Sequence, residues 1–248
     1  MKELKHLMYF ERLLDDAHNE LVRQAEAEGD LAIGYTCFHA PEVLLNLGSC
    51  FSVRLRAPHT GSIDIATYYM SYYTCEFARA LVERGIEGGY QFLDAMIGVD
   101  ACSMMNRAME HFEILKVNDK PNFFVTHCDI PYKITDYTLD SYVKQMRIHV
   151  LDKLTEVYGV DTSDAAIRQA VAEHNEVCSI ISEMAEMRKA ENPVITGYEF
   201  HVINLVSYTC PKALILPYLR ETLKELKKRK PDEKSPFRAR VAIVGLEI

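Results

Sequence analysis

The predicted fold depends on residues 72–107, which include Tyr72-Tyr73-Thr74-Cys75-Glu76-Phe77-Ala78-Arg79, then Gly89-Tyr90-Gln91-Phe92-Leu93-Asp94-Ala95-Met96-Ile97-Gly98, then Asp100-Ala101-Cys102-Ser103 and Arg107. Cys75 opens a predicted helix over 75–86, and Cys102 follows a predicted buried strand over 92–97. Open α/β sheets build their sites in loops beyond the carboxyl ends of parallel strands. The stretch therefore predicts part of a parallel sheet, with two thiols that face one metal centre as one hypothesis.

The first half of the chain alternates between short apolar strands and helices. Strands are predicted at 31–35, 51–55, 92–97 and 122–126, and helices at 3–27, 41–48, 75–86 and 102–115. This alternation indicates βαβ units with right-handed crossovers. The strands are short and apolar, as a sheet covered on both faces requires. We expect the α/β class, with a short parallel sheet of about four strands flanked by helices.

The second half predicts a helical block. Apolar stripes at three- and four-residue spacing indicate two long helices, over 139–157 and 167–184, and shorter helices are expected at 196–207 and 212–229. Residues 240–245 resemble the first strand of a new α/β unit. The expected organisation is an N-terminal helix (1–28), an α/β domain (29–135), a helical region (136–236) and a first strand of a second, truncated α/β domain (237–248).

Composition excludes some classes of function. The 248 residues carry a net charge of -8, which gives nucleic-acid binding no overall electrostatic support. No apolar run reaches the roughly 18 residues that span a membrane, and the amino terminus does not read as a signal peptide. We therefore expect a cytoplasmic protein. Its seven scattered cysteines favour reduced thiols or metal ligands over a disulfide framework.

Spacing alone leaves the role of the cysteines open. Soft thiolate ligands suit iron, but Cys75 and Cys102 lie too far apart for a compact ferredoxin-type motif, so small buried hydrophobic residues are the simpler interpretation. Cys37 follows the first strand and is either an extra ligand or a packed turn thiol. The other cysteines have no motif around them and are interpreted as core or surface thiols: Cys50, Cys128, Cys178 and Cys210.

Five short motifs occur in an order that is specific to one family. They are Gly34-Tyr35-Thr36-Cys37 with Pro41-Glu42-Val43, then Gly48 to Arg56, Cys75-Glu76-Phe77-Ala78-Arg79, Gly89-Tyr90 with Phe92-Leu93-Asp94, and Cys102 with Arg107. Over much of residues 31–113 the chain resembles the 2-hydroxyacyl-CoA dehydratase and benzoyl-CoA reductase family. The third motif resembles that family's Cys-Pro-Phe-Ala-Arg, and the fifth its Cys-Asp…Arg.

The resemblance implies a 4Fe–4S cluster in each subunit, with Cys75 and Cys102 as two ligands in a cluster-binding domain over 29–135. The family's third cysteine lies in a later α/β domain, which fits the expected truncation. The implied reaction removes water from a 2-hydroxyacyl-CoA, or reduces an aromatic acyl-CoA, by oxygen-sensitive one-electron ketyl radical chemistry. The implied partners are a homologous second subunit, an ATP-dependent activator protein and the acyl-CoA substrate, with no nucleic acid and no membrane.

Departures from the family pattern leave alternatives open. Glu76 replaces the motif's proline and Ser103 its aspartate, and Arg54-Leu55-Arg56 stands where the catalytic-type subunit has an acidic residue. The chain therefore looks more like the partner-type subunit, or a reductase relative, than the subunit that binds and dehydrates substrate. The first alternative is a non-catalytic electron-relay or scaffold subunit. The others are a metal-free α/β protein with structural cysteines and an enzyme of unrelated chemistry on the same scaffold.

The residues that bind substrate are less well specified, and no catalytic residue is identified. Arg54 and Arg56 share one face of a strand, where they either bind a phosphate of coenzyme A or form a solvated strand end. His39 and His59 lie in loops at the expected site, where a role at the substrate competes with a solvated loop histidine. The tyrosines before Cys75 are interpreted as subunit-interface or core residues: Tyr68, Tyr69, Tyr72 and Tyr73.

Overall fold

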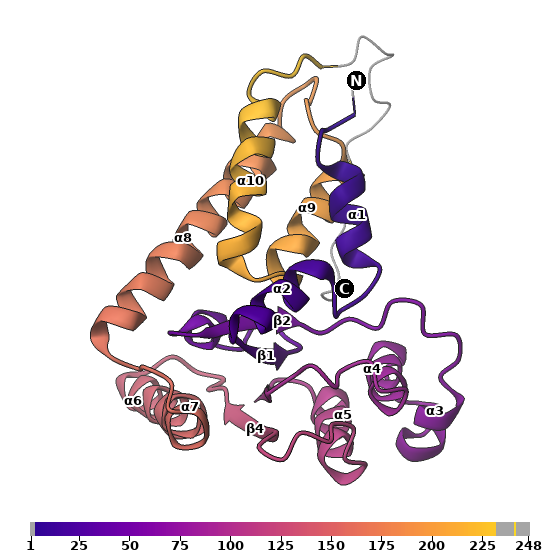
Figure 1. Cartoon of the computed structure of the whole chain (residues 1–248), viewed down its shortest axis with the longest axis vertical. Coiled ribbons are helices and arrows are strands. Elements are labelled where there is room, and N and C mark those ends of the chain that lie inside the picture. The colour runs from indigo at the N-terminus through magenta and orange to yellow at the C-terminus, as the bar shows by residue number, and fades with distance from the viewer. Residues whose placement is uncertain (1–2, 232–240, 242–248) are drawn as a thin grey trace.

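A computed structural model describes residues 3–231 and 241, and its described residues form a four-stranded parallel sheet covered by helices (Figure 1). The strands are β1 (Leu31–Tyr35), β2 (Cys50–Arg54), β3 (Ala95–Asp100) and β4 (Phe124–Asp129), in the order β2-β1-β3-β4. The predicted α/β class with a short parallel sheet is confirmed. Because strand order reverses between β1 and β3, the crevice of the sheet opens there, beyond the carboxyl ends of the strands.

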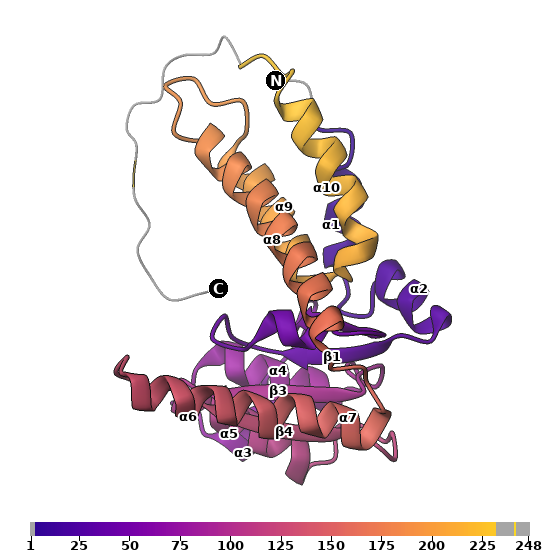
Figure 2. The same cartoon turned by 90° about the vertical axis from the view of Figure 1, so that its left-hand side faces the viewer.

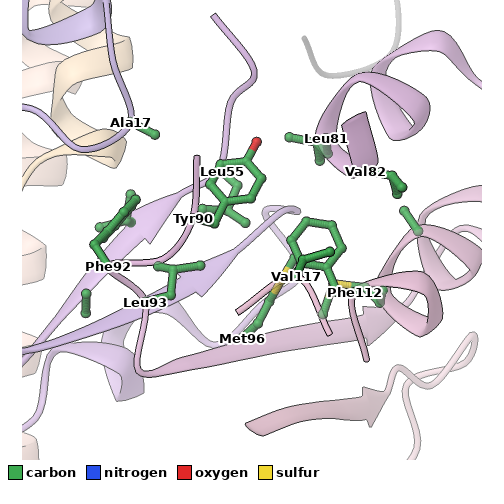
Figure 3. Close-up of a cluster of buried hydrophobic side chains, with 14 of the residues drawn as sticks. Ala17, Leu55, Leu81, Val82, Tyr90, Phe92, Leu93, Met96, Phe112 and Val117 are labelled. Atoms are coloured by element: carbon green, nitrogen blue, oxygen red, sulfur yellow. The ribbon is translucent and has the colours of Figure 1, made fainter. Parts of the chain in front are cut away.

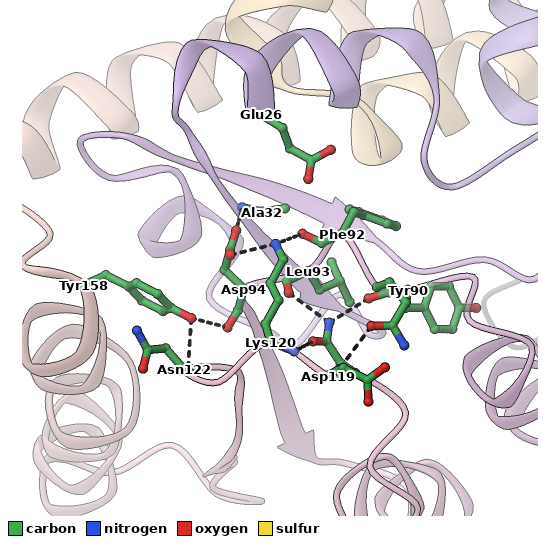
Figure 4. A network of polar contacts seen from close by, with 12 residues as sticks. Glu26, Ala32, Tyr90, Phe92, Leu93, Asp94, Asp119, Lys120, Asn122 and Tyr158 are labelled. Atoms are coloured by element: carbon green, nitrogen blue, oxygen red, sulfur yellow. Dashed lines mark hydrogen bonds and ion pairs between the residues drawn. The ribbon is translucent and has the colours of Figure 1, made fainter.

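The third strand begins at Ala95, three residues later than the sequence predicts, because Phe92-Leu93-Asp94 forms a braced turn (Figure 4). Asp94 accepts hydrogen bonds from the Ala32 backbone N–H and from Lys120 Nζ, both at 2.8 Å. Tyr158 Oη donates to the Asp94 carbonyl at 2.8 Å. These bonds fix where β3 starts against β1, and so where its carboxyl end and Cys102 lie.

Three helices cover one face of the sheet: α3 (Asp64–Met70), α4 (Glu76–Ile86) and α5 (Ser103–Ile114). Figure 3 shows the core between them and the strands, where Leu81, Met96 and Phe112 are fully buried. Tyr90 stacks on Phe112 at 5.6 Å between ring centroids. A Cβ at Gly34 would lie 2.9 Å from Leu93 Cδ1, so a larger residue at this position of β1 would require the Leu93 side chain to shift.

The opposite face is covered by α6 (Asp136–Met146), a π-helical turn η2 (Arg147–Leu151) and α7 (Asp152–Tyr158), as Figures 1 and 2 show. Residues 136–158, which the sequence assigns to the helical region, thus pack on the sheet. The helix predicted over 41–48 is a 3₁₀ helix, η1 (Glu42–Asn46). It stops because Asn46 Oδ1 accepts the Ser52 N–H at 3.0 Å and turns the chain into β2.

The predicted N-terminal helix is two helices, α1 (Leu7–Leu14) and α2 (Glu20–Glu28). The apolar residues at helical spacing continue through the break, so the sequence pattern does not reveal it. The break occurs because Asn19 Oδ1 accepts hydrogen bonds from the backbone N–H groups of Leu21 and Val22 and so starts a new helix. Helix α2 ends at Gly29 with φ of 93°, a left-handed conformation that favours glycine.

Helix α1 packs in a bundle with α8 (Asp164–Met187), α9 (Gly197–Thr209) and α10 (Lys212–Leu226). Figure 1 shows the bundle on the β2 side of the sheet. Of the predicted helical region, α8, α9 and α10 form this bundle, which α1 joins, whereas residues 136–158 do not belong to it. The strand expected over 237–248 lies outside the described residues except for Val241, which is exposed.

A buried ion pair links the bundle to the sheet. Lys212 Nζ lies 2.6 Å from Glu42 Oε1, and the two side chains are only 3% and 11% exposed. Glu42 also accepts a hydrogen bond from Ser52 Oγ at 3.3 Å. On its other side, His174 Nδ1 lies 3.6 Å from Glu42 Oε2, and His174 Nε2 is 3.4 Å from Cys178 Sγ. The Lys212–Glu42 ion pair therefore connects α10 to η1, and His174 and Cys178 of α8 lie next to it.

His174 is expected to make stability depend on pH. Burial lowers its pKa below the usual value, against the opposite pull of the Glu42 carboxylate. The unfolded chain therefore binds this proton first as pH falls, so wild type should lose unfolding free energy below about pH 6.5. Urea denaturation at pH 7.5 and pH 5.5 measures the loss. His174→Gln should lose less over the same interval, and equal losses in the two proteins would contradict this assignment.

Candidate functional site

Cys75 and Cys102 occupy equivalent positions, one residue before α4 and one residue before α5. Cys102 also follows the carboxyl end of β3, as the sequence predicts. Both thiols are exposed, and neither forms a disulfide. The interpretation of the two cysteines as small buried residues is therefore wrong. The structure places both at the amino ends of helices on the same face of the sheet.

The two cysteine junctions lie next to each other. The Cys75 backbone N–H donates to Met104 Sδ at 3.2 Å, and Met104 belongs to the first turn of α5. The turn that carries Cys102 is closed by a hydrogen bond from Asn106 Nδ2 to Asp100 Oδ1. The Cys102 carbonyl accepts the Asn106 N–H at 2.9 Å. The start of each helix is thus braced against its own turn and against the other helix.

Arg79 is a structural part of this site whose role the sequence does not reveal. It is buried, and its Nε donates to the Thr74 carbonyl at 3.1 Å. Its Nη1 donates to Thr67 Oγ1 at 2.7 Å, and its guanidinium lies 5.5 Å from the Tyr72 ring centroid. Arg79 therefore holds the segment that leads into Cys75. Its signals in the sequence are its place one turn after Cys75 and at the end of the Cys75-Glu76-Phe77-Ala78-Arg79 motif, and neither reveals these contacts.

The remaining cysteine candidate lies elsewhere. Cys37 is half-buried and packs with the core on the α6–α7 face, whereas α4 and α5 lie on the opposite face. Among residues 3–231 and 241, no three side chains of His, Cys, Asp or Glu gather so that they could hold a metal ion. Within this part of the chain, Cys75 and Cys102 are therefore a pair of donors.

The substrate candidates divide into two groups. Arg54 and Arg56 both line a cavity of about 230 Å³ at the carboxyl end of β2. His39 is exposed, and its backbone carbonyl accepts a hydrogen bond from Tyr142 Oη at 3.5 Å. His59 is exposed and lies 3.8 Å from Asp15. The arginines share a cavity, and His39 does not line it.

The tyrosines before Cys75 are surface residues. Tyr68, Tyr72 and Tyr73 are exposed, with Tyr73 at 90%, so the core-packing interpretation is wrong for them. Other large apolar side chains are exposed after β4, where Tyr132 is 99% and Ile134 is 94% exposed. The carboxyl edge of the sheet thus carries a set of uncovered aromatic and apolar side chains.

The family is decided by a comparison over most of the chain. Residues 37–248 match the family described as 2-hydroxyglutaryl-CoA dehydratase, D-component. The chain belongs to this family. A further comparison finds 18% identity over 238 residues with the (R)-phenyllactyl-CoA dehydratase beta subunit of Clostridium sporogenes. That alignment covers 96% of this chain and 62% of the relative, so the chain spans less than two thirds of the length of that relative.

The chemistry of these two thiol donors is that of iron–sulfur ligands, of which they would supply two. Thiolates are the usual protein ligands of such clusters, and both thiols are exposed to receive one. The amino ends of α4 and α5 favour negative charge, which an anionic thiolate-ligated cluster brings. No helix among the described residues has the length and apolar character to span a membrane.

Proposed function

We propose that this chain is a subunit of an iron–sulfur enzyme that dehydrates 2-hydroxyacyl-CoA thioesters by one-electron ketyl radical chemistry. The observation that carries the proposal is the pair of exposed thiols, Cys75 and Cys102, on two braced and adjacent helix starts. Membership of the D-component family supports the substrate class. Further ligands would come from outside this pair, because the two residues supply only two sulfur donors.

The residues of this chain would hold and shield the cluster. Cys75 and Cys102 would supply thiolate ligands, and the first turns of α4 and α5, which have no side-chain cap hydrogen bond, offer backbone N–H groups to an anionic group. Arg79 keeps the Thr74 carbonyl and the Cys75 backbone in place. When bound, the cluster would supply one low-potential electron for the thioester carbonyl, chemistry that would make loss of the hydroxyl group feasible.

The uncovered side chains at the carboxyl edge support a partner at this site. Tyr72 and Tyr73 lie directly before Cys75, and Tyr132, Ile134 and Tyr137 follow β4. Exposed aromatic and apolar groups of this kind are typical of protein interfaces. We propose that a homologous second subunit covers them and closes the site against water. An ATP-dependent activator protein would deliver the electron.

The function is tested with the full-length chain, co-expressed with its partner subunit and supplied anaerobically with the activator and ATP. A panel of 2-hydroxyacyl-CoA thioesters is incubated with the complex, and 2-enoyl-CoA is measured by chromatography. The proposal expects dehydration of at least one thioester, only when activator and ATP are present. A cluster-loaded complex that dehydrates none of them would contradict it.

One observation favours a second candidate, an electron-relay subunit. Arg54 and Arg56, rather than an acidic residue, line the cavity next to β2. In a relay subunit the cluster would transfer electrons without contacting substrate. The electron paramagnetic resonance spectrum of this subunit's cluster would then be unchanged when the thioester is added, whereas a spectral change would favour direct contact with substrate.

Arg79→Met is expected to weaken retention of the cluster. Partners that orient ligands typically contribute 10- to 100-fold to metal affinity, so iron loss to a chelator should accelerate by about that factor. The measurement is the decay of the cluster's visible absorbance under anaerobic conditions. Arg79→Lys, which can keep one of the two hydrogen bonds, should fall between Arg79→Met and wild type. A decay rate equal to wild type in Arg79→Met would contradict a positioning role.

A further inference from the structure

The cavity beside the cysteine pair has the form of a binding pocket. It has a volume of about 230 Å³ and lies between the end of β2, the start of α4 and the last turns of α9. Phe77 and Ala80 of α4 form one wall, and Leu205 and Tyr208 of α9 form another. Phe77 is two residues from Cys75, so one helix borders both the pocket and the proposed cluster site.

Two arginines, Arg54 and Arg56, line this one pocket. Arg54 and Arg56 are separated by a single residue in an extended segment and therefore point to the same side, whereas Leu55 between them is buried in the core. Arg54 is only 6% exposed, and its guanidinium lies 3.9 Å from the Phe38 ring centroid. The aromatic contact fixes the plane and direction of this positive group.

The Arg56 guanidinium has N–H donors that could bind a ligand. Its Nη1 donates to the Leu14 carbonyl at 3.2 Å, and no other side-chain hydrogen bond from Arg56 occurs among the described residues. Burial lowers its pKa, and the charge of Arg54 adds to the effect. None of the described residues that line the pocket is acidic. An oxyanion in the pocket could thus accept hydrogen bonds from Arg56 without an acidic neighbour among the lining residues.

The pocket also has an apolar part, which restricts the ligand further. Ala57 and Pro58 line it beyond the end of β2, and Phe77 and Leu205 line it from α4 and α9. A small inorganic ion would leave these surfaces uncovered. The lining suits a ligand in which an anionic group is attached to an organic moiety. Paired guanidinium groups match the several oxygens of a phosphate better than a single lysine would.

We propose that this pocket binds a phosphate group of the coenzyme A thioester. The proposal rests on the proposed function, since that function supplies a coenzyme A ligand. It places the nucleotide end of the thioester between β2 and α9, with α4 leading from the pocket to Cys75. The chain would thereby contribute to thioester binding as well as to the cluster.

Isothermal titration calorimetry of the full-length chain with coenzyme A tests the proposal. Arg56→Gln should weaken binding by about 10- to 100-fold, the size expected for a lost charge-assisted hydrogen bond. Arg56→Lys should recover part of the loss. Ala80→Phe, which fills the pocket from α4 and leaves both arginines unchanged, should also weaken binding. Arg168→Gln, at an arginine that is 80% exposed on α8, is the matched control.

Pantetheine and glutarate identify the group that the arginines bind. If the phosphate is recognised, pantetheine should bind weakly and equally to wild type and Arg56→Gln. Equal coenzyme A affinity in wild type and Arg56→Gln would overturn the proposal. It would also be overturned if the affinity for glutarate depended on Arg56 and the affinity for coenzyme A did not. Iron content is measured on the same preparations. If the chain takes up no iron but binds coenzyme A in a way that depends on Arg56, the proposed cluster is rejected and the proposed pocket is kept. If the chain takes up iron but its coenzyme A binding does not depend on Arg56, the proposed pocket is rejected and the proposed cluster is kept.

Discussion

A complex that carries Cys102→Ser is expected to lose more than about 100-fold of its dehydration activity, because removal of a ligand should exceed the 10- to 100-fold cost of losing an outer partner. Cys75→Ser should have a similar effect, since the two residues have equivalent positions before α4 and α5. The measurement is the rate of 2-enoyl-CoA formation under anaerobic conditions, with activator and ATP in excess.

Cys178→Ser is the matched control for these substitutions. Cys178 is also an exposed thiol, but it lies on α8 in contact with His174 and far in the fold from the start of α4. Its replacement should leave the rate within about two-fold of wild type, because serine on a helix surface changes little. Circular dichroism and complex formation should be unchanged in all three variants. Full activity in either Cys75→Ser or Cys102→Ser would contradict the proposed ligand role.

The second large effect is expected at the buried ion pair. Lys212→Met removes the cation that lies 2.6 Å from Glu42 Oε1 and leaves a buried carboxylate without its main partner. Breaking a buried pair in this way typically costs about 3–5 kcal/mol of stability. Urea denaturation at pH 7.5 measures the loss, and the dependence of unfolding on urea should keep the wild-type slope if the folded state is unchanged.

Two further variants separate this pair from a general effect of losing lysine. Lys153→Met removes an exposed lysine that pairs with Glu156 at 3.2 Å and should cost at most about 1 kcal/mol. The double variant Lys212→Met with Glu42→Gln should be more stable than Lys212→Met alone, because no uncompensated charge remains buried. A loss in Lys212→Met no larger than in Lys153→Met would show that the pair does not anchor the bundle.

The sequence predicts the elements whose signals are local. β1 and α4 are apolar or periodic segments bounded by glycine, and both match their predicted bounds closely. The amino-terminal break is missed because Asn19 lies inside a continuous apolar stripe, and only its side-chain bonds to Leu21 and Val22 reveal the new helix. Helix α3 is missed because its exposed tyrosines obscure the helical period.

The sequence predicts only those site residues that lie next to a single predicted helix or strand. Cys75 and Cys102 are placed correctly because each is adjacent to an element with a clear local signal. The contacts of Arg79 and the pocket between β2 and α9 depend on how distant elements pack, and so does the pairing of Glu42 with Lys212, which are 170 residues apart. No period or motif in the chain encodes these contacts.

The most direct test of the central claim is the iron and acid-labile sulfide content of the full-length chain after anaerobic reconstitution. A Cys-ligated cluster of the 4Fe–4S type predicts about four iron and four sulfide per chain in wild type. It predicts loss of both in the Cys75→Ala and Cys102→Ala double variant, with Cys178→Ser unchanged. A wild-type chain that binds no iron, or a double variant that retains the wild-type iron content, would contradict the claim that these two thiols hold the cluster.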